Sequence, residues 1–210
     1  MAYIVGLTAT DGCLYTGLKK INFKSSDREL VETYLRVLGR NNPVKRAATR
    51  AGGVVYFTEY RDARLYRWFL TIGLMPAKSL ILGAIDVPDE FLAPCLRGLF
   101  EGDGHIQNFV HHPTPSTYPE YTYERLWTYF NSASRRHLEW IQERVRAVLG
   151  LLGRVEQLTK QEGRHDFFRL KYGNGESVVL LPMMYPTARV PMLERKWKIW
   201  NNYQIRHGLA

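Results

Sequence analysis

Two stretches of the chain end in the same way: IVGLTATDG at residues 4–12 and LRGLFEGDG at residues 96–104. Each is mostly apolar, has a small residue in its middle and closes on Asp-Gly, which predicts a helix that stops at the glycine in a left-handed conformation. The residues after each stretch alternate between apolar and polar, as in a strand with one buried face. That alternation predicts core-facing side chains at four positions: Leu14, Leu18, Ile106 and Val110.

Further landmarks follow both stretches in the same order. FKSS at residues 23–26 leads into a predicted helix over residues 28–38, and FNSA at residues 130–133 leads into one over residues 134–149. The spacing of Ser26 and Glu29 predicts a capping box, and Gly39 and Gly150 are expected to close these helices. Strands are predicted over residues 54–58 and 167–172, and third helices over 62–74 and 177–185, the second shortened by Pro182.

This shared order indicates a duplicated unit. Asp103 follows Asp11 by 92 positions and Phe130 follows Phe23 by 107, so the second copy holds 15 extra residues between these landmarks. The extra residues fit a longer hairpin loop around residues 112–120, which is rich in Pro, Thr and Tyr. Insertions confined to loops are what a duplication predicts, and we expect a first repeat over residues 1–86 and a second over residues 87–210.

The composition is that of a folded protein with a polyanionic partner. Its 210 residues are 45% hydrophobic and 23% charged, and 29 basic against 20 acidic residues give a net charge of +9 and a pI near 9.6. Such an excess suits a nucleic acid. No apolar run reaches the roughly 20 residues of a membrane helix, so we expect no membrane partner and a cytoplasmic location, prokaryotic or phage-borne, with an organelle left open. The two cysteines, Cys13 and Cys95, are expected to be reduced thiols.

The two stretches resemble the paired signature of the LAGLIDADG homing endonucleases, in the form that carries both motifs in one chain. The first copy matches at Gly6, Leu7, Ala9, Asp11 and Gly12, and the second at Leu96, Gly98, Leu99, Asp103 and Gly104. The resemblance spans nearly the whole chain. It implies an α+β fold of two pseudo-symmetric αββαββα repeats, whose antiparallel sheets form a saddle around two packed motif helices.

The resemblance also implies a site where the motif helices end. Small residues along both helices would permit close packing and bring Asp11 and Asp103 side by side. A single Asp-Gly is more simply a helix end, but two close carboxylates repel unless cations lie between them. The implied cofactor is Mg²⁺, which binds carboxylate and phosphate oxygens, with Mn²⁺ as a substitute and Ca²⁺ supporting binding without efficient cleavage. Metal-activated water would attack each phosphorus in line.

Three further side chains bear on that site. Residues 75–79 and 193–196 are similar to the family's lysine-bearing segments, which makes Lys78 and Lys196 catalytic candidates that offset charge on the phosphate. Each could instead be a solvated surface lysine, and Arg195 or Lys198 could take the role of Lys196. Glu101 lies about 200° from Asp103 around the helix axis, which favours an interface residue over a metal ligand.

DNA contacts are expected from the strands, because a two-stranded ribbon fits the major groove. Side chains opposite in parity to the core positions would face outward, and nearby basic residues, Lys160 and Arg164 among them, would extend the positive face. The predicted DNA-binding residues are Tyr15, Lys19, Asn22, Lys24, Lys45, Arg46, Arg50, His105, Gln107, His111, Arg154, Arg169 and Lys171.

The function that the resemblance implies is a site-specific endonuclease acting as a monomer. It would cut both strands of a long asymmetric double-stranded DNA target, because two diverged halves present different side chains. A free-standing, intron-encoded enzyme is expected rather than one embedded in an intein, since the termini leave no room for a splicing domain. The alternative is an RNA maturase or a DNA-binding regulator on the same fold without cleavage. The presence of both Asp11 and Asp103 favours the nuclease.

Overall fold

The computed structural model of the chain describes residues 1–113, 116–158 and 166–209. Its helices and strands fall into two runs with the same order. The first run is α1 (Ala2–Thr10), β1 (Gly12–Tyr15), β2 (Lys20–Ser25), α2 (Arg28–Val37), β3 (Lys45–Ala48), β4 (Val54–Arg61) and α3 (Ala63–Thr71). The second run is α4 (Leu92–Asp103), β5 (His105–His111), β6 (Tyr123–Ser132), α5 (Arg135–Leu149), β7 (Arg154–Gln157), β8 (Phe168–Tyr172) and α6 (Asn174–Met184). The predicted αββαββα repeat is therefore confirmed twice, and one more helix, α7 (Glu194–His207), follows the second copy.

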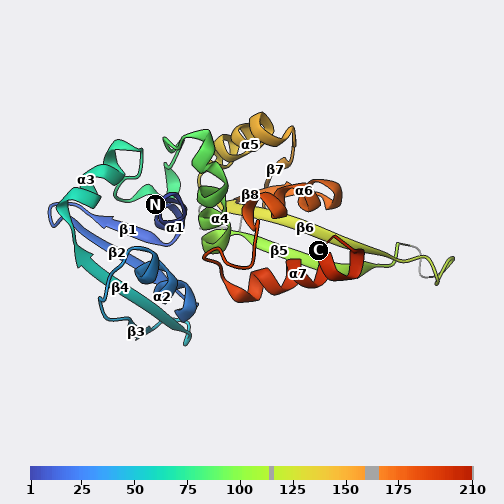
Figure 1. Cartoon of the computed structure of the whole chain (residues 1–210), viewed down its shortest axis with the longest axis horizontal. Coiled ribbons are helices and arrows are strands. Elements are labelled where there is room, and N and C mark those ends of the chain that lie inside the picture. The colour runs from blue at the N-terminus through green and yellow to red at the C-terminus, as the bar shows by residue number, and fades with distance from the viewer. Residues whose placement is uncertain (114–115, 159–165, 210) are drawn as a thin grey trace.

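Each repeat contributes one four-stranded antiparallel sheet. The strand orders are β1-β2-β4-β3 and β5-β6-β8-β7. The two sheets lie on either side of α1 and α4, which pack against each other in the middle of the molecule (Figure 1). This arrangement confirms the predicted α+β saddle with central motif helices. The division of the chain between residues 86 and 87 stays a prediction.

The central helices touch through their backbones. A Cβ added to Gly98 would lie 2.2 Å from the carbonyl oxygen of Tyr3, and one added to Gly6 would lie 2.2 Å from that of Cys95. Only glycine permits so close a crossing, because any side chain would separate the helices. The close crossing thus fixes the positions of the two helix ends relative to each other.

The inner face of each sheet packs against helices and forms the core. Leu14 and Ile106 are buried there, as the alternation predicts. The same prediction is wrong for Leu18 and Val110, whose exposed fractions are 50% and 56%. Leu18 lies in the turn beyond Tyr15, where β1 has already ended. Val110 lies near the tip of the β5–β6 hairpin, which projects past the covering helices (Figure 1).

The helix ends follow the sequence in most places. Gly39 and Gly150 come after α2 and α5 in the left-handed conformation, as predicted. The helix α6 begins three residues before the predicted start and holds Pro182 in its last turn. The predicted capping box at Ser26 is wrong, because Asp27 is the N-cap of α2. Across the described ranges, no helix combines the length and the hydropathy needed to cross a membrane.

Candidate functional site

Asp11 and Asp103 lie at matching ends of the two central helices. Asp11 directly follows α1, and Asp103 is the last residue of α4. Burial and the neighbouring Asp103 charge raise the pKa of Asp11 to about 7. Desolvation by the surrounding protein also raises the pKa of Asp103, although this side chain is the more solvent-exposed of the two. The positive charges of Lys196 and Lys78 act in the opposite direction and lower that pKa. The helix crossing therefore brings two carboxylates into one electrostatic site.

The position after each aspartate requires glycine because there is no room for a Cβ, and not because of its backbone angles. Gly104 has a φ of −79° and Gly12 begins β1 without a positive φ, so the predicted left-handed stop is wrong at both. A Cβ at Gly12 would lie 2.6 Å from the carbonyl oxygen of Thr8, and one at Gly104 would lie 2.4 Å from that of Phe100. Glycine lets each strand fold back closely over the last helical turn, which places the aspartate at the bend.

Lys78 and Lys196 lie behind these bends in equivalent positions. They are buried, with exposed fractions of 6% and 2%. Each ammonium donates a hydrogen bond to the carbonyl oxygen of a motif glycine, Lys78 to Gly12 and Lys196 to Gly104. Burial lowers the pKa of both lysines, that of Lys196 to about 8. The surface-lysine alternative is therefore wrong for both side chains.

The neighbours of Lys196 on α7 are engaged elsewhere. Arg195 forms an ion pair with Asp27 of the first repeat, with Nη2 and Oδ2 2.9 Å apart. Lys198 pairs with Glu194 at 2.9 Å on the exposed side of the helix. Lys196 is thus the basic side chain of this segment that reaches the motif.

Glu101 lies in the interior and joins the two repeats. Its carboxylate accepts hydrogen bonds from the Tyr3 hydroxyl at 2.5 Å, the Tyr185 hydroxyl at 3.1 Å and the Leu193 backbone N–H at 2.7 Å. Tyr3 belongs to α1, so these bonds tie α4 to the other central helix. The contacts agree with an interface residue rather than a metal ligand.

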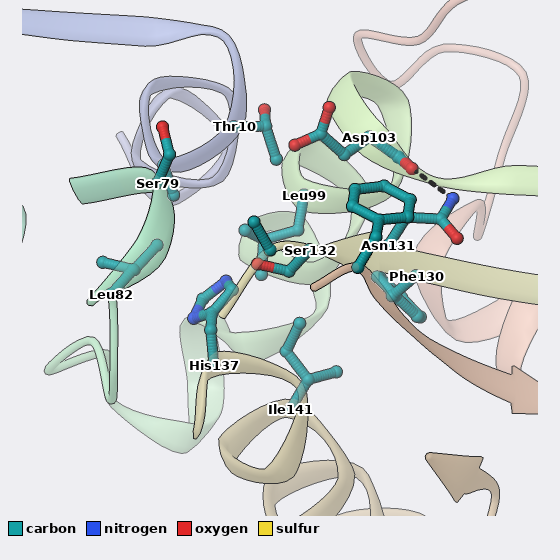
Figure 2. Close-up of a pocket in the computed structure, with 13 residues that line it drawn as sticks. Thr10, Ser79, Leu82, Leu99, Asp103, Phe130, Asn131, Ser132, His137 and Ile141 are labelled. Atoms are coloured by element: carbon teal, nitrogen blue, oxygen red, sulfur yellow. Dashed lines mark hydrogen bonds between the residues drawn. The ribbon is translucent and has the colours of Figure 1, made fainter. Parts of the chain in front are cut away.

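A pocket of about 160 Å³ opens beside Asp103 (Figure 2). Thr10, Asn131, Ser132 and His137 contribute to its lining together with Asp103. The side-chain amide of Asn131 donates a hydrogen bond to the backbone carbonyl of Asp103 at 2.7 Å. The sequence marked Asn131 only as part of a repeat landmark, and nothing in a single strand residue signals contact with a helix end. The pocket therefore borders the Asp103 side of the site.

The outer face of the first sheet collects four of the predicted DNA-binding residues. Directly paired residues on neighbouring strands share a face, and this face carries Tyr15, Lys20, Asn22, Lys24, Lys45, Phe57 and Glu59. Lys20 is a basic residue that the sequence analysis missed, because the turn after β1 shifts the register. Three predicted residues are placed elsewhere: Lys19 in that turn, Arg50 in the turn after β3, and Arg46 on the opposite parity of β3, paired with Tyr56.

The outer face of the second sheet holds all six residues predicted there. They are His105, Gln107, His111, Arg154, Arg169 and Lys171. Trp127 and Tyr129 lie between them and were missed, although a strand that alternates aromatic and basic residues is a signal for such a surface. Lys171 Nζ lies 3.4 Å from the centre of the Trp127 ring, and the Arg169 guanidinium lies 5.0 Å from that of Tyr129. Lys160 and Arg164 lie outside the described residues.

The donor chemistry of the site fits a hard divalent cation. Mg²⁺ commonly binds one or two carboxylates and completes its shell with water and substrate phosphates. Asp11 and Asp103 supply two carboxylates whose mutual repulsion a cation would relieve. Within the described ranges, no group of three or more His, Cys, Asp or Glu side chains could hold a metal ion. Water and DNA would therefore have to supply the other ligands.

Solved structures share this fold over almost the whole chain. The homing endonuclease I-WcaI bound to its DNA recognition sequence aligns with a TM-score of 0.59 and 9% identity, over 93% of this chain and 84% of that chain. I-DmoI in complex with DNA and Ca aligns with a TM-score of 0.57 and 13% identity, over 95% and 96%. The N-terminal LAGLIDADG domain of DUF199/WhiA aligns with a TM-score of 0.55 and 14% identity, over 92% and 84%. A search of curated proteins finds no match.

The fold and its paired motif helices define a single chain built from two αββαββα repeats, a fold that it shares with the LAGLIDADG proteins above. Residues 1–72 match the family model of a LAGLIDADG-like domain. The predicted resemblance to the LAGLIDADG homing endonucleases is therefore confirmed. Because nucleases and DUF199/WhiA share the fold at similar TM-scores, the activity has to be argued from the site.

Proposed function

We propose that this protein is a site-specific endonuclease that hydrolyses both strands of a double-stranded DNA target. One observation carries the proposal: Asp11 and Asp103 end two packed helices at the same place, and a buried lysine lies behind each bend. A helix crossing that served packing alone would not need two carboxylates in mutual repulsion. The solved neighbours I-WcaI and I-SmaMI bound to DNA support this choice.

The residues of the site divide the work of the reaction. Asp11 and Asp103 would hold divalent cations, Mg²⁺ by preference. Such a cation would lower the pKa of a bound water molecule and would neutralise negative charge on the phosphate. The buried lysines add positive charge behind the motif bends. The outer faces of the two sheets bind the duplex on either side, because their basic side chains neutralise phosphates and their polar and aromatic side chains reach base edges.

Differences between the two outer faces favour an asymmetric target and a monomeric enzyme. The first face is rich in lysine, whereas the second carries histidine, arginine and large aromatic side chains. A symmetric dimer would instead require a palindromic site. We extend the proposal to an intron-encoded enzyme that acts on chromosomal DNA in the cytoplasm.

Selection of cleaved sequences from a randomised DNA library in the presence of Mg²⁺ tests the activity. EDTA should stop cleavage, Mg²⁺ or Mn²⁺ should restore it, and Ca²⁺ should support binding with little cutting, because its looser geometry holds an in-line water poorly. Asp11→Asn and Asp103→Asn should each abolish double-strand cleavage and keep DNA binding. Asp89→Asn is the matched control, since that side chain is 81% exposed and pairs with Arg144 before the other end of α4.

The outcomes separate the candidate activities. Substantial cutting of both strands by either variant would contradict the role of that aspartate, and cleavage that persists in EDTA would contradict the use of a metal. A wild-type protein that binds a selected DNA but leaves it intact with Mg²⁺ and Mn²⁺ would indicate a DNA-binding regulator. Binding to structured RNA without binding to DNA would indicate a maturase.

A further inference from the structure

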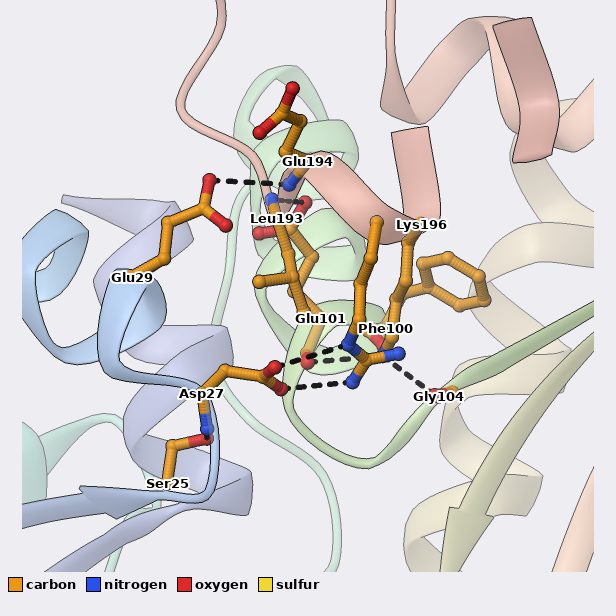
Figure 3. A network of polar contacts seen from close by, with 10 residues as sticks. Ser25, Asp27, Glu29, Phe100, Glu101, Gly104, Leu193, Glu194 and Lys196 are labelled. Atoms are coloured by element: carbon orange, nitrogen blue, oxygen red, sulfur yellow. Dashed lines mark hydrogen bonds and ion pairs between the residues drawn. The ribbon is translucent and has the colours of Figure 1, made fainter. Parts of the chain in front are cut away.

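The ammonium of Lys196 uses all of its donors within the protein. A lysine ammonium carries three N–H groups, and Lys196 Nζ donates to the carbonyl oxygens of Phe100 at 2.6 Å, Glu101 at 3.0 Å and Gly104 at 2.6 Å (Figure 3). These carbonyls lie in and just after the last turn of α4, where helical carbonyls lack partners within the helix. A cation is also favoured there by the helix dipole. Lys196 therefore caps the helix that ends in Asp103.

Lys78 is bound much less completely. Among the described residues, its Nζ has a single hydrogen-bond partner, the carbonyl oxygen of Gly12. Two N–H groups remain for a water molecule or a phosphate oxygen. Lys78 also lies in a short 3₁₀ turn (Lys78–Leu80) after Ala77, which has a left-handed φ of +53°. The two lysines are thus equivalent in position but not in the donors that they leave free.

The start of α7, which carries Lys196, is held by both repeats. The backbone N–H of Leu193 donates to Glu101 Oε1 at 2.7 Å (Figure 3). Arg195 donates to both oxygens of Asp27, at 2.9 Å and 3.2 Å. These contacts place Lys196 against the end of α4 before any ligand binds. The first repeat has Ala9 at the position of Glu101, so it lacks a carboxylate that could anchor the turn of Lys78 in the same way.

We propose that the two lysines have different roles: Lys78 acts at the scissile phosphate, and Lys196 is a positioning residue that holds the end of α4 and with it the Asp103 carboxylate. This assignment rests on the nuclease function proposed above. Loss of the Lys78 ammonium removes charge from the reacting phosphate and leaves the fold unchanged. Loss of the Lys196 ammonium loosens the last turn of α4 and weakens the binding of a cation at Asp103.

The structural half of the test uses protein without metal or DNA. Lys78→Met and Lys196→Met remove the ammonium and keep most of the side-chain length, and Lys198→Met on the exposed side of α7 is the matched control. Lys196→Met should lower Tm by roughly 5 °C and speed hydrogen exchange of the amides at residues 100–105 by about tenfold or more. Lys78→Met and Lys198→Met should change neither by much. If Lys196→Met does not fold, Arg195→Met, which releases α7 from Asp27, is the milder variant, with the same direction expected.

The catalytic half measures single-turnover cleavage of the selected target against Mg²⁺ concentration. Lys78→Met should lower the cleavage rate by about 100-fold at every Mg²⁺ concentration, including saturation. Lys196→Met should raise the Mg²⁺ concentration for half-maximal rate by about tenfold and recover most of the rate at saturation, as loss of an outer contact to a metal ligand does. Lys198→Met should match the wild type in both quantities.

Two results would overturn the assignment. One is a Lys196→Met variant with unchanged exchange at the end of α4 and a maximal rate as low as that of Lys78→Met. The other is a Lys78→Met variant that cleaves at the wild-type rate. If the wild type cleaves no DNA at all, the proposed function has failed and the role of Lys78 fails with it. Hydrogen exchange then still decides whether Lys196 holds the helix end.

Discussion

At the scale of single residues, Asp11 carries an electrostatic cost in the metal-free protein. Burial and the Asp103 charge raise its pKa to about 7, well above the value of roughly 3.9 for an unfolded chain. The native state therefore binds this proton more tightly than the unfolded state does. The stabilisation that results is complete below about pH 4 and is lost as the pH rises to 7. A cation would compete with the same proton, so metal affinity should rise over that range.

Because the pKa of Asp11 is raised, the substitution Asp11→Asn should change how stability depends on pH in EDTA. The asparagine cannot ionise, so the variant should gain stability relative to wild type between pH 5 and pH 8, by about 1–2 kcal/mol after allowance for solvent screening at a half-buried site. Urea denaturation followed by circular dichroism at both pH values measures the difference. Asp89→Asn, on an exposed side chain, should show no such change between the two pH values. An Asp11→Asn advantage that shrinks as the pH rises would contradict the raised pKa.

The candidate site residues could be chosen from the sequence, but the contacts that surround them could not be predicted from it. Asp11 and Asp103 stand out because two copies of one motif place them identically. The three carbonyl partners of Lys196 lie 92 to 96 positions away in the chain, and Arg195 and Lys198 look equally suitable in the sequence. Only the packing of α7 against β5, which brings Lys196 to the end of α4, selects this lysine, and no local pattern of residues encodes that packing.

At the scale of the helices, the backbone crossing at Gly6 and Gly98 supports the whole site. The substitution Gly98→Ala would place a Cβ 2.2 Å from the carbonyl oxygen of Tyr3. We expect it to destabilise the protein by about 3 kcal/mol, the upper end for overpacking, because the blocking atom is backbone and cannot rotate away. Gly175→Ala is the control: its added Cβ meets nothing within 4 Å in α6, so it should be neutral or slightly stabilising. Equal urea midpoints for the two variants would contradict the close crossing.

At the scale of the sheets, Cys13 can report on the face that we propose binds DNA. It is exposed on β1 and paired with Asn22, whereas Cys95 is buried. Iodoacetamide should therefore modify Cys13 alone, and bound target DNA should slow that reaction by about tenfold, as protection of a covered surface predicts. The double substitution Cys13→Ser and Arg46→Cys moves the exposed thiol to β3, on the sheet face opposite to that of Lys45. Bound DNA should not protect a thiol on that face. Protection of the cysteine at position 46 would show that DNA reaches both faces.

The order and type of the elements could be predicted because periodicity and glycine positions are local. The two residues that were wrongly expected in the core, Leu18 and Val110, are exposed for non-local reasons. One is the length of β1, which its pairing with β2 decides, and the other is how far the helices cover the β5–β6 hairpin. Alternation shows that a strand has two faces. It does not show where the covering layer stops.

At the scale of the whole molecule, the two sheets lie on opposite sides of the central helices, so each should read its own half of a target (Figure 1). Lys24 is on the outer face of the first sheet and Gln107 on that of the second, where its side-chain oxygen accepts a hydrogen bond from the Tyr129 hydroxyl at 3.3 Å. This bond holds the Gln107 amide in the face that would meet the bases. A base-edge contact is worth roughly 1–3 kcal/mol of discrimination at one position, whereas a phosphate contact affects all sequences alike.

Gln107→Ala should therefore relax the preference at one or two adjacent base pairs in the half read by the second repeat, and Lys24→Ala should do so only in the other half. Arg154→Ala is the contrasting variant: its side chain is 81% exposed at the sheet edge, so it should weaken binding to all sequences and lower the salt slope by about one. Profiling cleavage or binding over all single-base variants of the selected target measures these effects. If Gln107→Ala changes both halves equally, or lowers affinity with no positional signature, the assignment of one sheet to one half-site is wrong. The nuclease proposal would stand after that result, because it rests on the paired aspartates and not on the strand faces.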